Sequence, residues 1–137
     1  GLTELVKLKN LFWLNLGNTQ ITDAGLKELA QLQQLTHLHL NDTKITNAGL
    51  KEVAKLQKLE SLNLNGVKIT DEDLKEVTRL QKLNELHLTN TKITDVGLMK
   101  IAKLQHLKWL YLSNIQVTDA GVAELKKALP TCRIDGP

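Results

Sequence analysis

The sequence predicts an α/β solenoid, with short parallel strands on one side of a stack and short helices on the other. Three observations lead to this fold class. Leucine recurs every 24 residues, two more leucines follow three and five positions later, and a helix-type pattern follows each strand-type pattern. Self-similarity at a fixed period is the signature of stacked repeats. Five copies open at Leu11, Leu35, Leu59, Leu83 and Leu107.

Size and composition limit the possible classes of protein. The chain has 137 residues, of which 42% are hydrophobic and only 3% aromatic, so we expect one domain with an aliphatic core. No apolar run approaches the ~20 residues needed to cross a bilayer, so no membrane partner is expected. The single cysteine, Cys132, cannot form an internal disulfide and weakly favours a reducing, cytoplasmic compartment.

Each copy begins with L-x-x-L-x-L, whose alternation has a period of two and predicts a short strand. The fourth and sixth positions are expected to face the core, as at Leu38 and Leu40. The third and fifth positions are expected to face outward, as at His37 and His39.

The helix of each copy follows the motif I/V-T-D/N, as in Ile45-Thr46-Asn47. Threonine is a good N-cap, and an acid suits the positive end of the helix dipole. Thr70 and Asp73 have the spacing of a capping box. These helices of about two turns are marginal alone, so we expect packing on neighbouring units to hold them.

A threonine lies in the turn of three copies, at Thr19, Thr43 and Thr91, and is replaced by Val67 and Ile115 in the other two. We expect the threonine hydroxyls to satisfy backbone groups in a ladder along this edge. Val67 and Ile115 should interrupt that ladder.

One strand and one helix cannot bury their leucines within a single unit, so the units should stack side by side. Because a helix is wider than the ~4.8 Å spacing of strands, the stack should curve with its sheet on the concave face. The predicted single domain covers 1–137. It comprises a partial unit at 1–10, five units at 11–34, 35–58, 59–82, 83–106 and 107–129, and an end segment at 130–137.

The repeat resembles the leucine-rich repeat family, in its helical ribonuclease-inhibitor-like and cysteine-containing subclasses. The positions that carry the resemblance are Leu38, Leu40, Ile45, Thr46, Gly49, Leu50, Val53 and Ala54. The resemblance implies a right-handed horseshoe with helices on the convex face. It also implies a binding role, without implying a particular ligand.

The two ends differ from the central copies. Residues 1–6 align with 25–30, which suggests a start partway through a helix of another repeat. Near the other end, Pro130, Cys132 and Ile134 resemble the L-P-x-C-x-I ending of bacterial leucine-rich repeat arrays, which suggests a natural terminus. Ile134 lies 24 residues after Leu110, so it is expected to form a short final strand.

The outward strand positions hold an unusual group of side chains. Both tryptophans, the only tyrosine and three of the four histidines fall there, although the core is already filled by leucine. Clustered aromatic rings with polar groups are typical of a protein-binding surface. The predicted partner-binding residues are Trp13, His37, His39, Asn63, Glu85, His87, Trp109 and Tyr111. The alternative is that these side chains are simply solvated.

Lysines and acids instead occupy the predicted helices, as in Lys27-Glu28 and Lys51-Glu52. Nucleic-acid binding would favour cations interleaved with aromatic rings on one surface. Here the aromatic residues and lysines are expected on opposite faces, so no nucleic-acid partner is predicted.

Two kinds of active site are conceivable at the outward strand positions. His37, Ser61 and Glu85 are neighbours in one row, but a catalytic triad needs the histidine between the nucleophile and the acid. His37, His39 and His87 could hold zinc only if their side chains lean together, with Glu85 as a fourth ligand. A polar binding face is the favoured interpretation, with no catalytic residue and no cofactor.

The sequence therefore predicts a non-enzymatic module that binds a protein or peptide on its concave face. The alternative is a truncated or engineered repeat scaffold that is mainly structural. Because Leu2, Leu5, Leu8, Leu11 and Leu14 would lack a preceding unit, that alternative predicts self-association through the N-terminal end.

Overall fold

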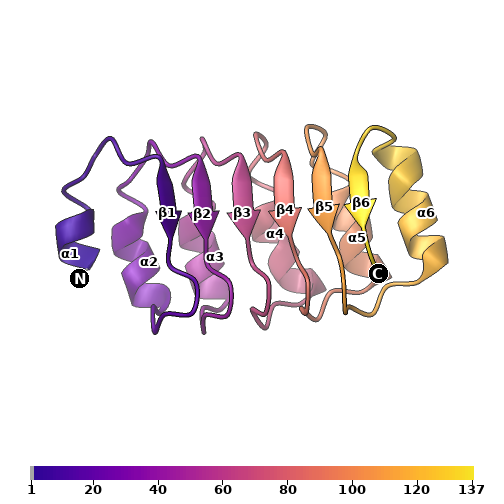
Figure 1. Ribbon diagram of the computed structural model, residues 1–137, viewed down its shortest axis with the longest axis horizontal. Coiled ribbons are helices and arrows are strands. Elements are labelled where there is room, and N and C mark those ends of the chain that lie inside the picture. Colours follow the sequence, from indigo (N-terminus) through magenta and orange to yellow (C-terminus); the bar gives the residue numbers. More distant parts are fainter. Residues whose placement is uncertain (1) are drawn as a thin grey trace.

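The computed structural model describes residues 2–137 and places six strands in one parallel sheet (Figure 1). The strands follow one another across the sheet in sequence order, so each unit lies beside its neighbours in the chain. This arrangement confirms the predicted solenoid. The strands are β1 (Trp13–Asn15), β2 (His37–His39), β3 (Ser61–Asn63), β4 (Glu85–His87), β5 (Trp109–Tyr111) and β6 (Arg133–Asp135).

The helices all cover one face of the sheet (Figure 1). They are α1 (Leu2–Leu5), α2 (Asp23–Leu29), α3 (Asn47–Val53), α4 (Leu74–Val77), which follows the 3-10 turn η1 (Asp71–Asp73), α5 (Asp95–Ile101) and α6 (Asp119–Ala128). The helices α2, α3 and α5 have seven residues, about two turns, as predicted. The helices α1 and α4 have four residues, and α6 has ten. No helix within residues 2–137 is both long and apolar enough to span a membrane.

The strand register builds one continuous aliphatic core. Paired residues are 24 apart in sequence, so Leu14 faces Leu38, Leu62 faces Leu86 and Leu110 faces Ile134. In the central units, both inward leucines of each strand are completely buried. The predicted final strand at Ile134 is confirmed, and Cys132 is buried beside it, which raises the pKa of its thiol.

The N-terminal side of this core is less well covered. Leu8 is 53% exposed, and Leu2, Leu5, Leu11 and Leu14 are only partly buried. A pocket of about 590 Å³ lies between α1 and the first turn, with a largely aliphatic lining. The expected exposure of leucines at this end is confirmed. Gly1 lies outside the described residues.

The turn threonines act within their own turns. The hydroxyls of Thr19, Thr43 and Thr91 donate to the carbonyl oxygen three residues earlier, at 2.6–2.7 Å. Each threonine satisfies a turn group as predicted, but the predicted ladder between copies is wrong because these bonds do not cross from unit to unit. In one of the two units that lack this threonine, the backbone N–H of Val67 donates to the Leu64 carbonyl at 3.1 Å.

A second polar contact does cross between units. Asp23 accepts hydrogen bonds from both the N–H and the hydroxyl of Thr46, at 2.8 and 2.6 Å. Asp71 holds Thr94 and Asp95 holds Thr118 in the same way. The bonds from Thr118 hold the pKa of Asp95 below its usual value. We call this contact the Asp–Thr clamp.

The predicted helix capping by threonine holds for only some of the helices. Thr94 and Thr118 do accept from an N–H of their own helix, as predicted. Thr22 and Thr46 make no side-chain capping bond, so the prediction is wrong for these two helices. The clamp does not itself prevent capping, because the hydroxyls of Thr94 and Thr118 donate to an aspartate and also accept an N–H of their own helix.

A glycine in the next helix makes room for each clamping aspartate. A Cβ on Gly97 would lie 2.3 Å from Asp71 Oδ1. Where the preceding unit has Asn47, this glycine is replaced by Asp73. Asn47 then donates to Asp73 at 3.0 Å, and Asp73 accepts from the N–H of Thr70 at 2.9 Å. The predicted capping box is present, and it replaces the clamp in this unit.

We predict that Gly97→Ala lowers the free energy of unfolding by about 1–3 kcal/mol, because the new methyl group displaces Asp71 from its bonds to Thr94. Urea denaturation measures the change. Gly25→Ala is the matched control, since its Cβ would meet only the flexible end of Leu2 and the side chain of Ile21. Equal stability of the two variants would contradict the role assigned to the clamp.

Candidate functional site

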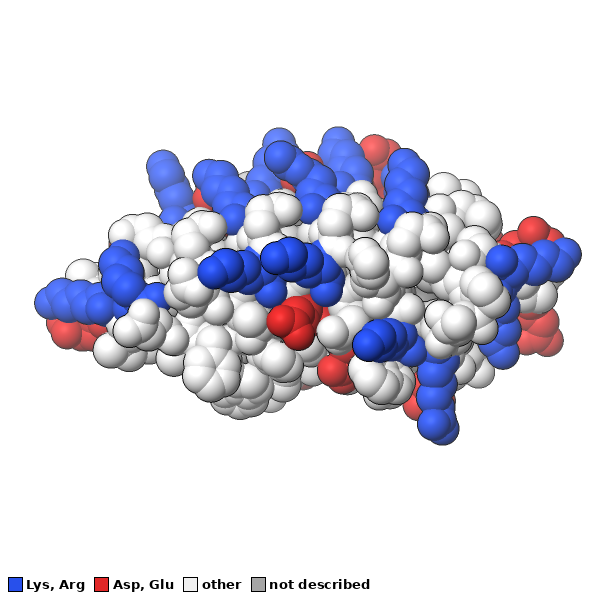
Figure 2. Space-filling model, turned by 90° about the horizontal axis from the view of Figure 1, so that it is seen from above, with Lys and Arg blue, Asp and Glu red and all other residues white. Residues whose placement is uncertain are grey.

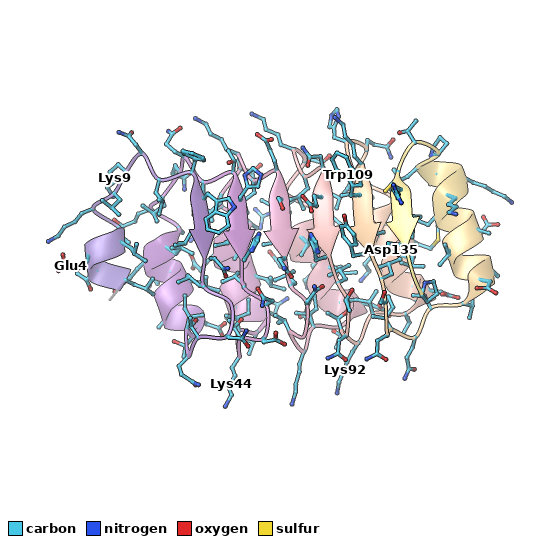
Figure 3. All side chains as sticks on the ribbon, in the orientation of Figure 1. Glu4, Lys9, Lys44, Lys92, Trp109 and Asp135 are labelled. Carbon is cyan, nitrogen blue, oxygen red and sulfur yellow. The ribbon has the colours of Figure 1, made fainter. Side chains whose placement is uncertain are left out.

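The third and fifth positions of each unit form one surface, which we call the sheet face. All eight predicted partner-binding residues lie on it, because the inward leucines alternate with them along every strand. Figure 3 labels Trp109 at the start of β5 and Asp135 at the end of β6. The sheet face consists of Trp13, His37, Ser61, Glu85, Trp109 and Arg133 at third positions, and Asn15, His39, Asn63, His87, Tyr111 and Asp135 at fifth positions.

The aromatic rings of this face are available for contact. Trp13 is 48% exposed and Trp109 is 43% exposed, although both are large apolar side chains. The edge of one ring meets the other in the Trp13–His39 pair, with 5.3 Å between centroids. Four strand spacings separate the two tryptophans, about 19 Å, so they flank the middle of the face rather than forming one cluster.

The middle of the sheet face is polar and connected. Glu85 accepts from the Ser61 hydroxyl at 3.3 Å and lies 2.8 Å from His87 Nε2. The His87 ring stacks on Tyr111 with 4.3 Å between centroids. Glu85, His87 and Tyr111 are therefore held in one arrangement. Ser61 faces outward as expected but is buried, because its larger neighbours cover it.

Two predicted residues also have local roles. The Asn63 side chain accepts from the N–H of Asn65 at 3.0 Å, which supports the following turn. His37 Nδ1 lies 2.8 Å from the hydroxyl of Thr36. Both residues lie on the sheet face, but part of their hydrogen-bonding capacity is used within the chain.

The sheet face extends one strand beyond the predicted residues. Arg133 and Asp135 are exposed on β6, where they line a hollow of about 210 Å³ with Trp109 and Tyr111. Sequence analysis missed these two residues. The signal was present, because a strand with Ile134 facing inward must direct both of its neighbours outward.

The geometry assembles neither a catalytic triad nor a zinc site from the residues of the sheet face. Ser61 bonds directly to Glu85, and His37 contacts Thr36 instead, so no triad forms. Within residues 2–137, no three histidine, cysteine or acidic residues are grouped to hold a metal ion. The sheet face presents aromatic rings, imidazoles, a carboxylate and a guanidinium group, which can make stacking, hydrogen-bonding and ionic contacts with a partner.

His39 makes this surface sensitive to pH. Partial burial lowers the pKa of His39, and the nearby His87 lowers it further, against the opposing effect of Glu85. Because the folded pKa lies below the unfolded one, the folded state binds fewer protons near pH ~6.5. The contribution of His39 to stability is therefore present above that pH and is lost as the pH falls.

We predict that His39 titrates below ~6.5 in the folded chain and that His87→Gln raises the pKa of His39, since the side chain of His87, which lowers it, is removed. NMR of the imidazole protons measures the titration midpoint of His39 in the native chain and in the variant. An unchanged His39 midpoint in the variant would show that the two rings do not interact.

A stack of strand–helix units around an aliphatic core, with rings exposed on its sheet, defines a repeat solenoid suited to binding. Leucine-rich repeat sequences match residues 13–30, 33–76 and 79–102, the middle segment as two copies. The chain is a leucine-rich repeat protein. A comparison with curated proteins gives no match.

Solved bacterial structures are similar over nearly the whole chain. An internalin (inlF) from Listeria monocytogenes is 31% identical over 97% of this chain, with a TM-score of 0.77. A leucine-rich repeat protein from Leptospira interrogans is 32% identical over 97%, with a TM-score of 0.67. Internalin C2 from Listeria monocytogenes is 28% identical over 100%, with a TM-score of 0.72. This chain spans only 36%, 39% and 56% of their respective lengths.

Proposed function

We propose that this chain is a non-enzymatic interaction module that binds a protein or peptide on its sheet face. Leucine-rich repeat domains are typically protein-interaction modules and generally not catalytic. The observation that carries the proposal is the exposure of Trp13 and Trp109 on a sheet whose core needs no aromatic residue. Exposed rings are the residues that most often dominate binding energy.

The residues divide into anchors and polar contacts. Trp13, Trp109 and Tyr111 are the proposed anchors, because a rigid ring buries a large area at little entropic cost. His37, His39, Asn63, Glu85 and His87 supply the polar contacts between them. Their side chains lie between the two tryptophans, so a partner that covers both anchors must cross them.

We also propose the finer family assignment and the unit boundaries. The strand register of 24 residues and the helix in each unit support the helical, ribonuclease-inhibitor-like or cysteine-containing subclass. The same register supports units at 11–34, 35–58, 59–82, 83–106 and 107–129 within a single domain. In this proposal the sheet face is the concave face.

We predict that Trp109→Ala combined with Tyr111→Ala abolishes partner capture while circular dichroism shows an unchanged fold, since neither ring fills the core. The immobilised chain is used to capture proteins from a lysate of its source organism. Each captured protein is then purified and its affinity measured by calorimetry.

Lys51→Glu is the control for this experiment, because Lys51 is exposed on α3, on the helical face. Capture should survive this charge reversal. If Lys51→Glu removed binding and the double alanine variant retained it, the sheet face would not be the binding surface.

A second candidate is a structural scaffold that associates with itself. The apolar pocket beside α1 and the exposed Leu8 favour this reading, because both present aliphatic surface to solvent. The occupant would be the same end of a second copy.

We predict that, if this second candidate holds, light scattering gives a mass that rises with protein concentration, and that Leu8→Lys reduces the rise by placing charge in the contact. A strict monomer whose amides in 2–16 are protected from hydrogen exchange would remove this candidate.

A further inference from the structure

The segments that join each helix to the next strand gather positive charge along one long edge of the solenoid. Figure 2 looks onto this edge, where blue side chains predominate. Five of these segments are 6–12, 30–36, 54–60, 78–84 and 102–108. Four of them carry two cations each, eight in total, whereas 30–36 carries none, and the one carboxylate among them is Glu60. We call these cations the basic edge. They are Lys7, Lys9, Lys55, Lys58, Arg79, Lys82, Lys103 and Lys108, and all are exposed.

Ion pairs compensate only part of this charge. Lys7 pairs with Glu4 at 3.8 Å, Lys55 with Glu52 at 2.8 Å and Arg79 with Glu76 at 3.4 Å. Within the part of the chain that the structure describes, the remaining five form no ion pair. They are Lys9, Lys58, Lys82, Lys103 and Lys108. The whole chain has a net charge of only +3, so the positive potential is concentrated here.

Helix dipoles account for some of these cations but not for all. The negative end of a helix dipole attracts cations within about one turn of the C-terminus. Lys7, Lys55, Arg79 and Lys103 lie two residues after a helix and fit this explanation. The others lie four to seven residues after a helix, closer to the start of the next strand: Lys9, Lys58, Lys82 and Lys108.

The location of these cations partly corrects the prediction that the lysines lie on the helices, away from the aromatic residues. Lys27, Lys51 and Lys75 do lie on the helices, as expected. The basic edge instead borders the strand starts, where Phe12 is 64% exposed and Trp13 and Trp109 begin their strands. Cations and exposed rings therefore meet along this border.

We propose that the basic edge is a second docking surface, which binds an acidic polypeptide segment in an extended conformation. From segment 6–12 to segment 102–108 there are four strand spacings, about 19 Å on the sheet side. An extended chain covers that length with about six residues. Charge complementarity selects an acidic segment, since the edge presents cations and amide groups but almost no carboxylate.

The single acid of this edge favours a polypeptide over other polyanions. Glu60 lines a hollow of about 320 Å³ together with Lys82, Asn84, His106 and Lys108. A polypeptide offers N–H groups to Glu60 as well as carboxylates to the lysines. The phosphates of a nucleic acid or a lipid offer only acceptors, so Glu60 would repel them.

The arrangement of rings also argues against single-stranded nucleic acid, which favours aromatic side chains spaced among the cations. Along this border the exposed rings are confined to the two ends, at Phe12 and Trp13 and at Trp109. The strand starts between them are His37, Ser61 and Glu85.

The test uses a fluorescent peptide of about twelve residues in which glutamate and serine alternate, with binding followed by anisotropy. We expect the triple variant Lys58→Glu, Lys82→Glu, Lys108→Glu to weaken binding about tenfold or more. The matched control is Lys44→Glu, Lys68→Glu, Lys92→Glu on the opposite edge, where all three lysines are exposed (Figure 3 labels Lys44 and Lys92). It changes the net charge equally and should alter binding less than about twofold.

Each other outcome overturns the proposal. Equal losses in the two triple variants would show a response to net charge alone. Absent peptide binding, or tighter binding of an oligothymidylate or a phosphatidylserine vesicle, would remove the polypeptide as occupant. Loss of peptide binding in the double variant Trp109→Ala, Tyr111→Ala would place the peptide on the sheet face and overturn the proposal. If this double variant still binds the peptide, the basic edge acts independently of the binding surface in the proposed function. If the triple glutamate variant fails to fold, the same three lysines at each edge are changed to glutamine instead, and the two glutamine variants are compared.

Discussion

The stacking of leucines between neighbouring units is the interaction on which the rest of this structure depends. A three-residue strand and a two-turn helix have too little apolar surface to be stable alone. In register, Leu38, Leu62, Leu86 and Leu110 form one buried row across four strands, and the other inward positions do the same. Because this row fills the interior with aliphatic groups, no space remains inside for the rings of Trp13 and Trp109.

The Asp–Thr clamp adds direction to this non-directional packing. Hydrophobic contact alone would tolerate a shift between units, whereas two hydrogen bonds from one threonine to one aspartate set the distance and angle. In one place Asn47 replaces the clamping aspartate, and Asp73 replaces the glycine of the next helix. The two side chains are hydrogen-bonded to each other, so the two positions change together within this chain. The clamp and the leucine row therefore both act between units rather than within them.

The features that repeat every 24 residues could be predicted from the sequence, because each position has the same environment in every copy. The inward leucines, the strand at Ile134 and the placement of the aromatic residues on the sheet follow from that period. The clamp could not be predicted in the same way. The I-T-D motif fits local helix capping equally well, and the partner of Thr46 lies in another unit. The basic edge was also missed, although Lys55, Arg79 and Lys103 recur every 24 residues, because helix dipoles account for cations at that position without a partner.

Accessibility of the two indole rings tests the central claim most directly, namely that the leucine core excludes the aromatic residues and leaves them on the sheet. Acrylamide quenching of the native chain, measured on Trp13→Phe and Trp109→Phe so that each ring is observed alone, reports this accessibility. The account predicts red-shifted emission and efficient quenching for both indoles. Blue-shifted emission with little quenching from either ring would mean that it is packed inside, and would contradict the account.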